Sequence, residues 1–197
     1  MIAVIDYGAG NTGSVLKAAR YLGFQAASVS QGECLSAAEK IILPGQGHFG
    51  AMMRALGERG MLAPLKAALR DAKPFLGICL GLQLLYEGSD EAPETPGLGL
   101  LSGRVQLFHG VFKVPQVGWN QLEMVQPSLL LRGVASGSFV YYCHSYYAPV
   151  TDESRAVTEY GQRFSAVTQV DNIFAVQFHP EKSGEIGLRV LDNFLRL

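Results

Sequence analysis

Three short segments of the chain are apolar throughout and lack the alternation of polar and apolar positions that marks a half-exposed strand. They span residues 2–5, 41–43 and 75–78. Continuous apolar runs of this length are typical of parallel strands that are buried on both faces. We therefore expect the three segments to be parallel strands of one sheet.

Helical patterns lie between these apolar segments. The clearest helix is expected to have Asn11 or Thr12 as its N-cap and to end at Gly23. Its apolar face would carry Val15, Leu16, Ala19 and Leu22. Strands that alternate with helices predict an open α/β sheet.

The second half of the chain is rich in strand patterns. Residues 103–108, 111–124, 138–143 and 165–178 are β-rich and are separated by turn residues. A last helix is expected to bury Val190, Leu191, Phe194 and Leu195. The predicted fold class is α/β, with an open, mixed and largely parallel sheet flanked by helices. Antiparallel or mixed strands are expected in the β-rich second half.

Length, composition and charge narrow the class of protein. The 197 residues, of which 48% are hydrophobic, fit a single compact domain over residues 1–197. The net charge is −1 and no basic block is present, so nucleic acid is not an expected partner. The amino-terminal segment has no basic region and Asp6 interrupts its apolar run, which argues against a signal peptide or membrane span. We expect a cytoplasmic enzyme.

The cysteines argue against a metal site. Cys34, Cys79 and Cys143 are odd in number and lack metal-ligand spacing, which suits free thiols in a reducing compartment. His144 follows Cys143, but adjacent residues of a strand point to opposite faces. No metal and no cofactor are expected.

Cys79 lies in the pattern Gly-x-Cys-x-Gly at the end of the apolar run 75–78. Such a pattern is typical of a strand that turns sharply into a helix and leaves the central side chain exposed on a strained elbow. The flanking Gly77 and Gly81 leave room for the turn. We expect a helix over residues 80–87, whose N-terminus would favour the thiolate. Cys79 is therefore a candidate nucleophile.

A base and its orienting group follow a hundred residues later, as His179-Pro180-Glu181. Proline favours an extended conformation of the preceding residue, and residues two apart in an extended segment point to the same side. Glu181 could then accept a hydrogen bond from one ring nitrogen of His179 and leave the other facing Cys79. This is the arrangement of a catalytic triad with a cysteine nucleophile.

Residues 8–13 match the dinucleotide-binding pattern Gly-x-Gly-x-x-Gly. That pattern requires an acidic residue at the end of the second strand, but the expected strand near residues 25–30 ends in serine. We favour a tight exposed turn beside the active-site end of the sheet. Ligands of such sheets bind at the carboxyl ends of the strands, where residues 6–11, 44–48, 79 and 179–181 should meet.

The elbow around Cys79 and residues 178–183 together resemble the class I, triad-type glutamine amidotransferases. The resemblance extends over almost the whole chain. Within that family, residues 6–11, 44–49, 118–120 and 144–146 look like those of the glutaminase subunit of imidazole glycerol phosphate synthase. The resemblance implies that glutamine is hydrolysed through a cysteine thioester by the triad Cys79, His179 and Glu181. Ammonia would pass to a partner cyclase, a (β/α)₈ barrel, in a heterodimer that serves histidine biosynthesis.

The resemblance also implies further roles. The backbone amide of Leu80 and the loop with Gln46 and Gly47 would stabilise the oxyanion. Positions that hold the substrate are Gly47, Gln83, Ser145 and Tyr146. Positions that face the cyclase are Asn11, Trp119, Tyr141 and Lys182. Gln46 and Gln116 depart from the family pattern, which usually has a small or β-branched residue and a histidine there.

Two other functions are compatible with a triad. One is a glutaminase that serves another synthase, for anthranilate, aminodeoxychorismate or pyridoxal phosphate. The other is a stand-alone cysteine hydrolase that cuts γ-glutamyl or peptide bonds and needs no partner. The segments that resemble partner-facing positions favour the glutaminase of imidazole glycerol phosphate synthase.

Overall fold

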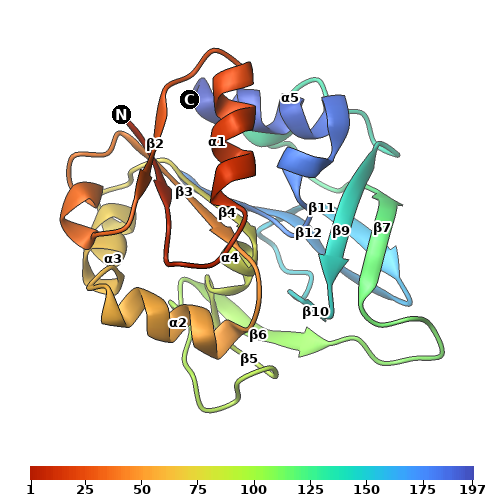
Figure 1. Cartoon of the computed structure of the whole chain (residues 1–197). Helices are drawn as coiled ribbons and strands as arrows, with labels where there is room; N and C mark the ends of the chain where they lie inside the picture. Colours follow the sequence, from red (N-terminus) through yellow and green to blue (C-terminus); the bar gives the residue numbers. More distant parts are fainter.

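A computed structural model describes all residues from 1 to 197 and is built on one eight-stranded sheet (Figure 1). The strand order is β2-β1-β3-β4-β13-β12-β11-β8. The parallel strands are β1 (Ile2–Ile5), β2 (Ala26–Val29), β3 (Lys40–Gly45), β4 (Phe75–Cys79) and β13 (Ile173–Val176). The antiparallel strands are β12 (Gln162–Val170), β11 (Ser154–Tyr160) and β8 (Glu123–Met124). The three predicted apolar strands and the predicted mixed α/β sheet are confirmed.

Helices cover both faces of the sheet, which explains why its strands are apolar without alternation. In β3, Ile42 packs into one hydrophobic cluster, while Ile41 and Leu43 pack into another on the opposite face. The first cluster includes residues of α1 (Thr12–Tyr21) and α5 (Gly184–Leu195). The second includes residues of α2 (Phe49–Glu58) and α3 (Leu62–Arg70). The predicted final helix is confirmed.

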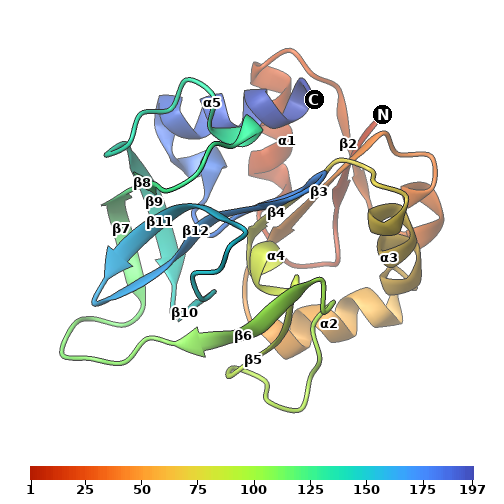
Figure 2. The same cartoon turned by 180° about the vertical axis from the view of Figure 1, so that it is seen from behind.

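The β-rich second half adds two smaller sheets beside the main one (Figure 2). One has the order β10-β6-β5 and the other pairs β7 with β9. Their bounds are β5 (Tyr86–Ser89), β6 (Leu101–Leu107), β7 (Gln116–Gln121), β9 (Phe139–His144) and β10 (Tyr146–Tyr147). The predicted strand region 111–124 is shorter than expected, because residues 111–115 precede β7 outside any strand.

The helix predicted over residues 80–87 is wrong in length. Helix α4 spans only Leu80–Gln83, and β5 already begins at Tyr86. The backbone carbonyl of Leu84 accepts a hydrogen bond from Leu98 N, and that of Leu85 accepts from Leu101 N. These carbonyls therefore pair with a distant segment instead of the next helical turn.

Short 3₁₀ helices complete the chain, at η1 (Gly32–Leu35), η2 (Leu129–Leu131) and η3 (Pro180–Lys182). None of the helices has both the length and the apolar character that crossing a bilayer would need. The cytoplasmic location stays a prediction.

Candidate active site

The strand-to-helix elbow at Cys79 has the strained geometry that its sequence predicts. Cys79 has φ 55° and ψ −107°, between the end of β4 and the start of α4. A Cβ at Gly77 would lie 2.5 Å from Gly81 O, and one at Gly81 would lie 2.1 Å from Leu43 O. Both positions therefore require glycine. The elbow holds the thiol at the carboxyl edge of the sheet, against the cavity described below.

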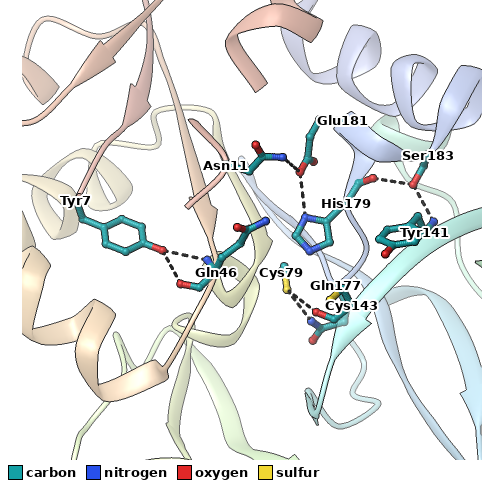
Figure 3. Close-up of polar contacts among 10 residues, drawn as sticks. All are labelled: Tyr7, Asn11, Gln46, Cys79, Tyr141, Cys143, Gln177, His179, Glu181 and Ser183. Carbon is teal, nitrogen blue, oxygen red and sulfur yellow. Dashed lines mark hydrogen bonds and ion pairs between the residues drawn. The ribbon is translucent and has the colours of Figure 1, made fainter. Parts of the chain in front are cut away.

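His179 and Glu181 form a buried pair beside this thiol. His179 Nδ1 lies 3.0 Å from Glu181 Oε1, and the two side chains are 2% and 1% exposed. The second ring nitrogen is turned towards Cys79 (Figure 3). The predicted pairing and the predicted extended conformation of His179 are confirmed, but the extended segment does not continue to Glu181. Glu181 belongs to η3, so a 3₁₀ turn and not an extended segment brings the carboxylate to the ring.

The charges of this pair stabilise each other. Burial disfavours the charged imidazole, but hydrogen bonding and charge from Cys79 and Glu181 outweigh it and raise the pKa of His179 to about 10. Burial also disfavours the Glu181 carboxylate, yet the hydrogen bond and charge of His179 keep its pKa below the usual value. At neutral pH the pair is therefore an imidazolium and a carboxylate.

Asn11 contacts the pair from the loop that follows β1. Its Nδ2 donates a hydrogen bond to Glu181 Oε1 at 3.1 Å. Asn11 does occupy the N-cap position of α1, but its side chain makes no capping bond. The predicted N-cap position is therefore confirmed, while the side chain serves the carboxylate instead of the helix.

A cavity of about 430 Å³ opens in front of the thiol. Nine of its lining residues are predicted site residues, namely Gln46, Gly47, Cys79, Leu80, Gln83, Ser145, Tyr146, His179 and Lys182. The other four, Glu91, Pro115, Cys143 and His144, were not predicted as site residues, although His144 lies in the segment 144–146 that carries the resemblance. A larger hollow of about 730 Å³ lies over β7, β8 and β11 and contains none of the predicted site residues.

Two polar side chains that line the cavity are held in place by backbone atoms. Gln83 Nε2 donates to Tyr146 O at 2.8 Å. Glu91 Oε2 accepts a hydrogen bond of 2.7 Å from the backbone N–H of Phe49, at the start of α2. Glu91 belongs to no motif and comes to the cavity only through the path of residues 90–97, so no local pattern could have identified it.

The loop after β3 runs directly beside the elbow. Gly45, the last residue of β3, is the register partner of Cys79. Gln46 is therefore the first residue of the loop that follows β3 beside the nucleophile. The Gln46 N–H donates to the Tyr7 hydroxyl at 3.0 Å, and this hydroxyl donates to Gln46 O at 3.1 Å. Gly47 has φ 94°, a value that favours glycine. Tyr7 lies in the segment 6–11 that carries the family resemblance, but no role was predicted for it.

Three of the residues predicted to face a partner gather on one surface. Trp119 on β7 is opposite Tyr141 on β9, with ring centroids 6.1 Å apart. Lys182 Nζ lies 5.9 Å from the Tyr141 ring centroid. Trp119 is 55% exposed. This aromatic surface therefore begins next to the triad, since Lys182 directly follows Glu181.

The strand that carries Tyr141 also holds the backbone of His179. The N–H of His179 donates to Tyr141 O at 2.9 Å. Ser183 Oγ accepts from the N–H of Tyr141 at 2.9 Å and donates to His179 O at 2.7 Å. Ser183 is 1% exposed. These three bonds fix the position of the imidazole relative to β9.

The chain is similar to known proteins over almost its whole length. The family model "Glutamine amidotransferase class-I" matches residues 3–197. The "Imidazole glycerol phosphate synthase subunit HisH" of Thermococcus kodakarensis is 48% identical over 204 aligned positions, covering 100% of both chains. The protein of the same name from Methanothermobacter thermautotrophicus is 48% identical over 198 positions, covering 100% of this chain and 98% of the relative. The one from Bacillus cereus strain G9842 is 45% identical and covers 98% of this chain and 93% of the relative.

Solved structures share the fold at lower identity. A structure described as "Crystal structure of glutamine amidotransferase" has a TM-score of 0.78 at 20% identity, covering 100% of this chain and 98% of the other. PurLQS from Thermotoga maritima has a TM-score of 0.74 at 19% identity, covering 99% and 97%. These structures support the α/β architecture alone.

Proposed function

The chain belongs to the class I glutamine amidotransferases and, among them, to the glutaminase subunits of imidazole glycerol phosphate synthase in histidine biosynthesis; from this we propose a role for each residue of its site. The observation that carries the assignment of roles is the buried His179–Glu181 pair at 3.0 Å beside the Cys79 elbow. No other part of the cavity combines a nucleophile, a base and an orienting carboxylate.

Cys79 is the proposed nucleophile. Its thiolate attacks the side-chain amide carbon of glutamine, and a C–S bond forms as the oxygen takes up negative charge. The C–N bond then breaks, and the proton of the His179 imidazolium goes to the departing ammonia. A γ-glutamyl thioester remains. His179 next removes a proton from water, whose oxygen attacks the thioester and releases glutamate and the Cys79 thiolate. Glu181 orients His179 throughout.

The oxyanion needs hydrogen-bond donors in the cavity. The elbow directs the backbone N–H of Leu80 into it, as in other nucleophile elbows. A second donor is proposed to come from the loop of Gln46 and Gly47. In this structure the N–H of Gln46 is engaged by Tyr7, so this donor becomes available only when the peptide turns. Loss of one oxyanion donor typically costs about 10² to 10³ in rate.

The part of the cavity lined by Gln83 and Glu91 is the proposed site for the amino-acid end of glutamine. Gln83 keeps its Oε1 free, because its Nε2 is used by Tyr146 O. Glu91 adds a carboxylate with one oxygen uncommitted, which suits an ammonium group. Gly47, Ser145 and Tyr146 complete this end of the site.

The proposed partner is the cyclase subunit, a (β/α)₈ barrel that forms a heterodimer with this chain and receives its ammonia. The exposed Trp119, packed on Tyr141 beside Lys182, supports a docking surface there. Exposed aromatic side chains of this kind are enriched among residues that dominate binding energy. Asn11 is proposed to lie at its edge, since the loop that carries it reaches Glu181.

We also propose that residues 1–197 form one domain. The main sheet joins β1 to β4 with β11 to β13, so the two halves of the chain share one core. A single cooperative unfolding transition, with coincident far-UV and near-UV circular dichroism signals, is the expected result. Two separate transitions would contradict it.

The test of the function is glutamate release from glutamine by the chain alone and by the chain with an imidazole glycerol phosphate cyclase and its nucleotide ligand. We expect slow release by the chain alone and an increase of about 10² to 10³ in the complex, the size of one oxyanion donor. Equal release with and without the cyclase would instead support a stand-alone hydrolase or the glutaminase of another synthase.

A further inference from the structure

The side chain of Gln177 contacts the nucleophile, although no motif indicates it. Gln177 follows β13, is fully buried, and donates from Nε2 to Cys79 Sγ at 3.6 Å (Figure 3). Strand β13 is the direct neighbour of β4, and Val176 is the register partner of Ile78. Gln177 directly follows Val176, and Cys79 directly follows Ile78, so the two residues are neighbours at the ends of adjacent parallel strands.

The orientation of the Gln177 amide is fixed by the backbone carbonyl of Tyr146, to which it is linked through the side chain of Gln83. Tyr146 O can only accept, so the amide group of Gln83 that lies 2.8 Å from it must be the NH₂ group. The same Gln83 Nε2 lies 3.2 Å from the Gln177 amide, and its partner atom must therefore be Oε1. The NH₂ group of Gln177 is then left to face the sulfur.

The sulfur of Cys79 has two polar neighbours of opposite kind. Gln177 offers it an N–H, whereas the backbone carbonyl of Cys143, 4.0 Å from Sγ, can only accept. A thiol can donate to the carbonyl, but a thiolate gains most from the N–H donor. The balance between these neighbours influences the charge state of the sulfur and the direction in which it points.

Packing alone does not explain a glutamine at this position. A fully buried amide costs free energy unless it is hydrogen-bonded, and methionine would fill nearly the same volume without that cost. The side chain of Gln177 bonds only Gln83 and the Cys79 sulfur. Its polarity therefore acts on the nucleophile.

We propose that Gln177 is a further catalytic residue, whose side-chain N–H stabilises the Cys79 thiolate and holds it in line with the cavity. The proposal rests on Cys79 being the nucleophile of the proposed function. Gln83 has a second task in it, because its amide locks Gln177 in the donating orientation.

The test measures how the rate of Cys79 alkylation by iodoacetamide depends on pH, since only the thiolate reacts. Alkylation is followed by mass spectrometry of the Cys79 peptide, because Cys34 and Cys143 are also free thiols. In Gln177→Met the midpoint of the pH profile is expected to rise by about one pH unit, the size of a tenfold change in ionisation. The matched control is Gln169→Met on β12, whose side chain bonds Ser128 and should leave the midpoint unchanged.

A second variant covers the case that Gln177→Met fails to fold. Gln83→Met leaves Gln177 in place but removes the amide that orients it, so a smaller upward shift is expected. The proposal is overturned if folded Gln177→Met has the wild-type midpoint, or if Gln83→Met does when Gln177→Met does not fold. A shift of equal size in Gln169→Met would overturn it as well. Because alkylation needs neither glutamine nor a partner, this result is independent of whether the cyclase stimulates the chain.

Discussion

The Tyr7 hydroxyl bonds both the N–H and the C=O of Gln46, at 3.0 Å and 3.1 Å. It thereby holds the N–H of Gln46 pointing to Tyr7 and not to the oxyanion that would form at Cys79 (Figure 3). The hydroxyl comes from the same loop as Asn11, which bonds Glu181. One loop thus contacts both the oxyanion segment and the triad.

Removing this hydroxyl should release the Gln46 peptide. In Tyr7→Phe we expect the kcat of the chain alone to rise about tenfold, the equivalent of one hydrogen bond, with little change in KM. The rate of the complex with the cyclase should stay the same, so the stimulation falls by the same factor. Tyr160→Phe, which loses a hydroxyl bond to Lys113 O away from the cavity, is the control. A basal rate at or below that of wild type would refute the role of Tyr7.

Replacement of the nucleophile should separate chemistry from folding. Cys79→Ala is expected to abolish glutamate release, because no thioester can form. The side chain is small and 6% exposed, so the unfolding temperature and the affinity for the cyclase should be close to those of wild type. Cys34→Ala, which removes an exposed thiol, should keep full activity. Residual turnover in purified Cys79→Ala would exclude the proposed mechanism.

The carboxylate of the pair should matter less than the imidazole. Glu181→Gln keeps a hydrogen-bond acceptor near His179, whereas His179→Ala removes the proton donor and base. We expect the larger loss of kcat in His179→Ala. Steady-state kinetics of both variants in the presence of the cyclase decide the order, and an equal or reversed order would contradict it.

Stability should be greatest near pH 6.5. Burial is the main cause that lowers the pKa of His144 to about 4, so only the unfolded chain takes up this proton between pH 6.5 and 4. Stability is therefore lost as pH falls through that window, by up to about 3 kcal/mol from His144. For His179, whose pKa is raised to about 10, the contribution is full below pH 6.5 and is lost as pH rises towards 10.

Urea unfolding across this pH range measures both effects. His144→Gln should flatten the acid limb between pH 6.5 and 4, and His179→Asn should flatten the alkaline limb. Below about pH 4.5 the wild type and His144→Gln should still lose stability, because His179 keeps the pKa of Glu181 below its usual value in the folded state. An acid limb unchanged in His144→Gln would show that other groups cause it.

The aromatic surface should carry much of the binding to the cyclase. Trp119→Ala is expected to weaken binding by about 30-fold, the effect of a central interface residue, while glutamine binding to the chain alone is unchanged. Tyr21→Ala removes an exposed aromatic residue, 78% against 55% for Trp119, from the C-terminal end of α1 and is the control. Titration calorimetry with the isolated cyclase checks the difference, and equal affinities of the two variants would contradict the proposed surface.

Local patterns predicted the features that depend on local geometry. The elbow at Cys79 follows from an apolar strand and two glycines within five residues, and its backbone angles bear this out. The pairing of His179 with Glu181 was also local, although a 3₁₀ turn produces it. Features that depend on the order of strands could not be predicted. Gln177 reaches Cys79 only because β13 lies beside β4, and nothing near Gln177 in the sequence indicates that neighbour.

The extended helix after Cys79 failed for the same reason. Residues 82–86 have good helical composition, but the carbonyls of Leu84 and Leu85 are taken by residues 98–101. Tyr86 then pairs with Leu101 in a strand. A long-range hydrogen-bond partner outweighs a weak local preference, and the sequence window around the elbow does not contain it.

The bonds among Tyr141, Ser183 and His179 limit how this protein can be re-engineered. Because β9 carries both an aromatic residue of the docking surface and the backbone partner of the catalytic histidine, grafting β7 and β9 from a glutaminase of another synthase would also move the imidazole. A chimera that changes partner would need Tyr141, Ser183 and η3 to be transferred together, because their hydrogen bonds depend on one another. Loops on the far side of the sheet could be exchanged without this constraint.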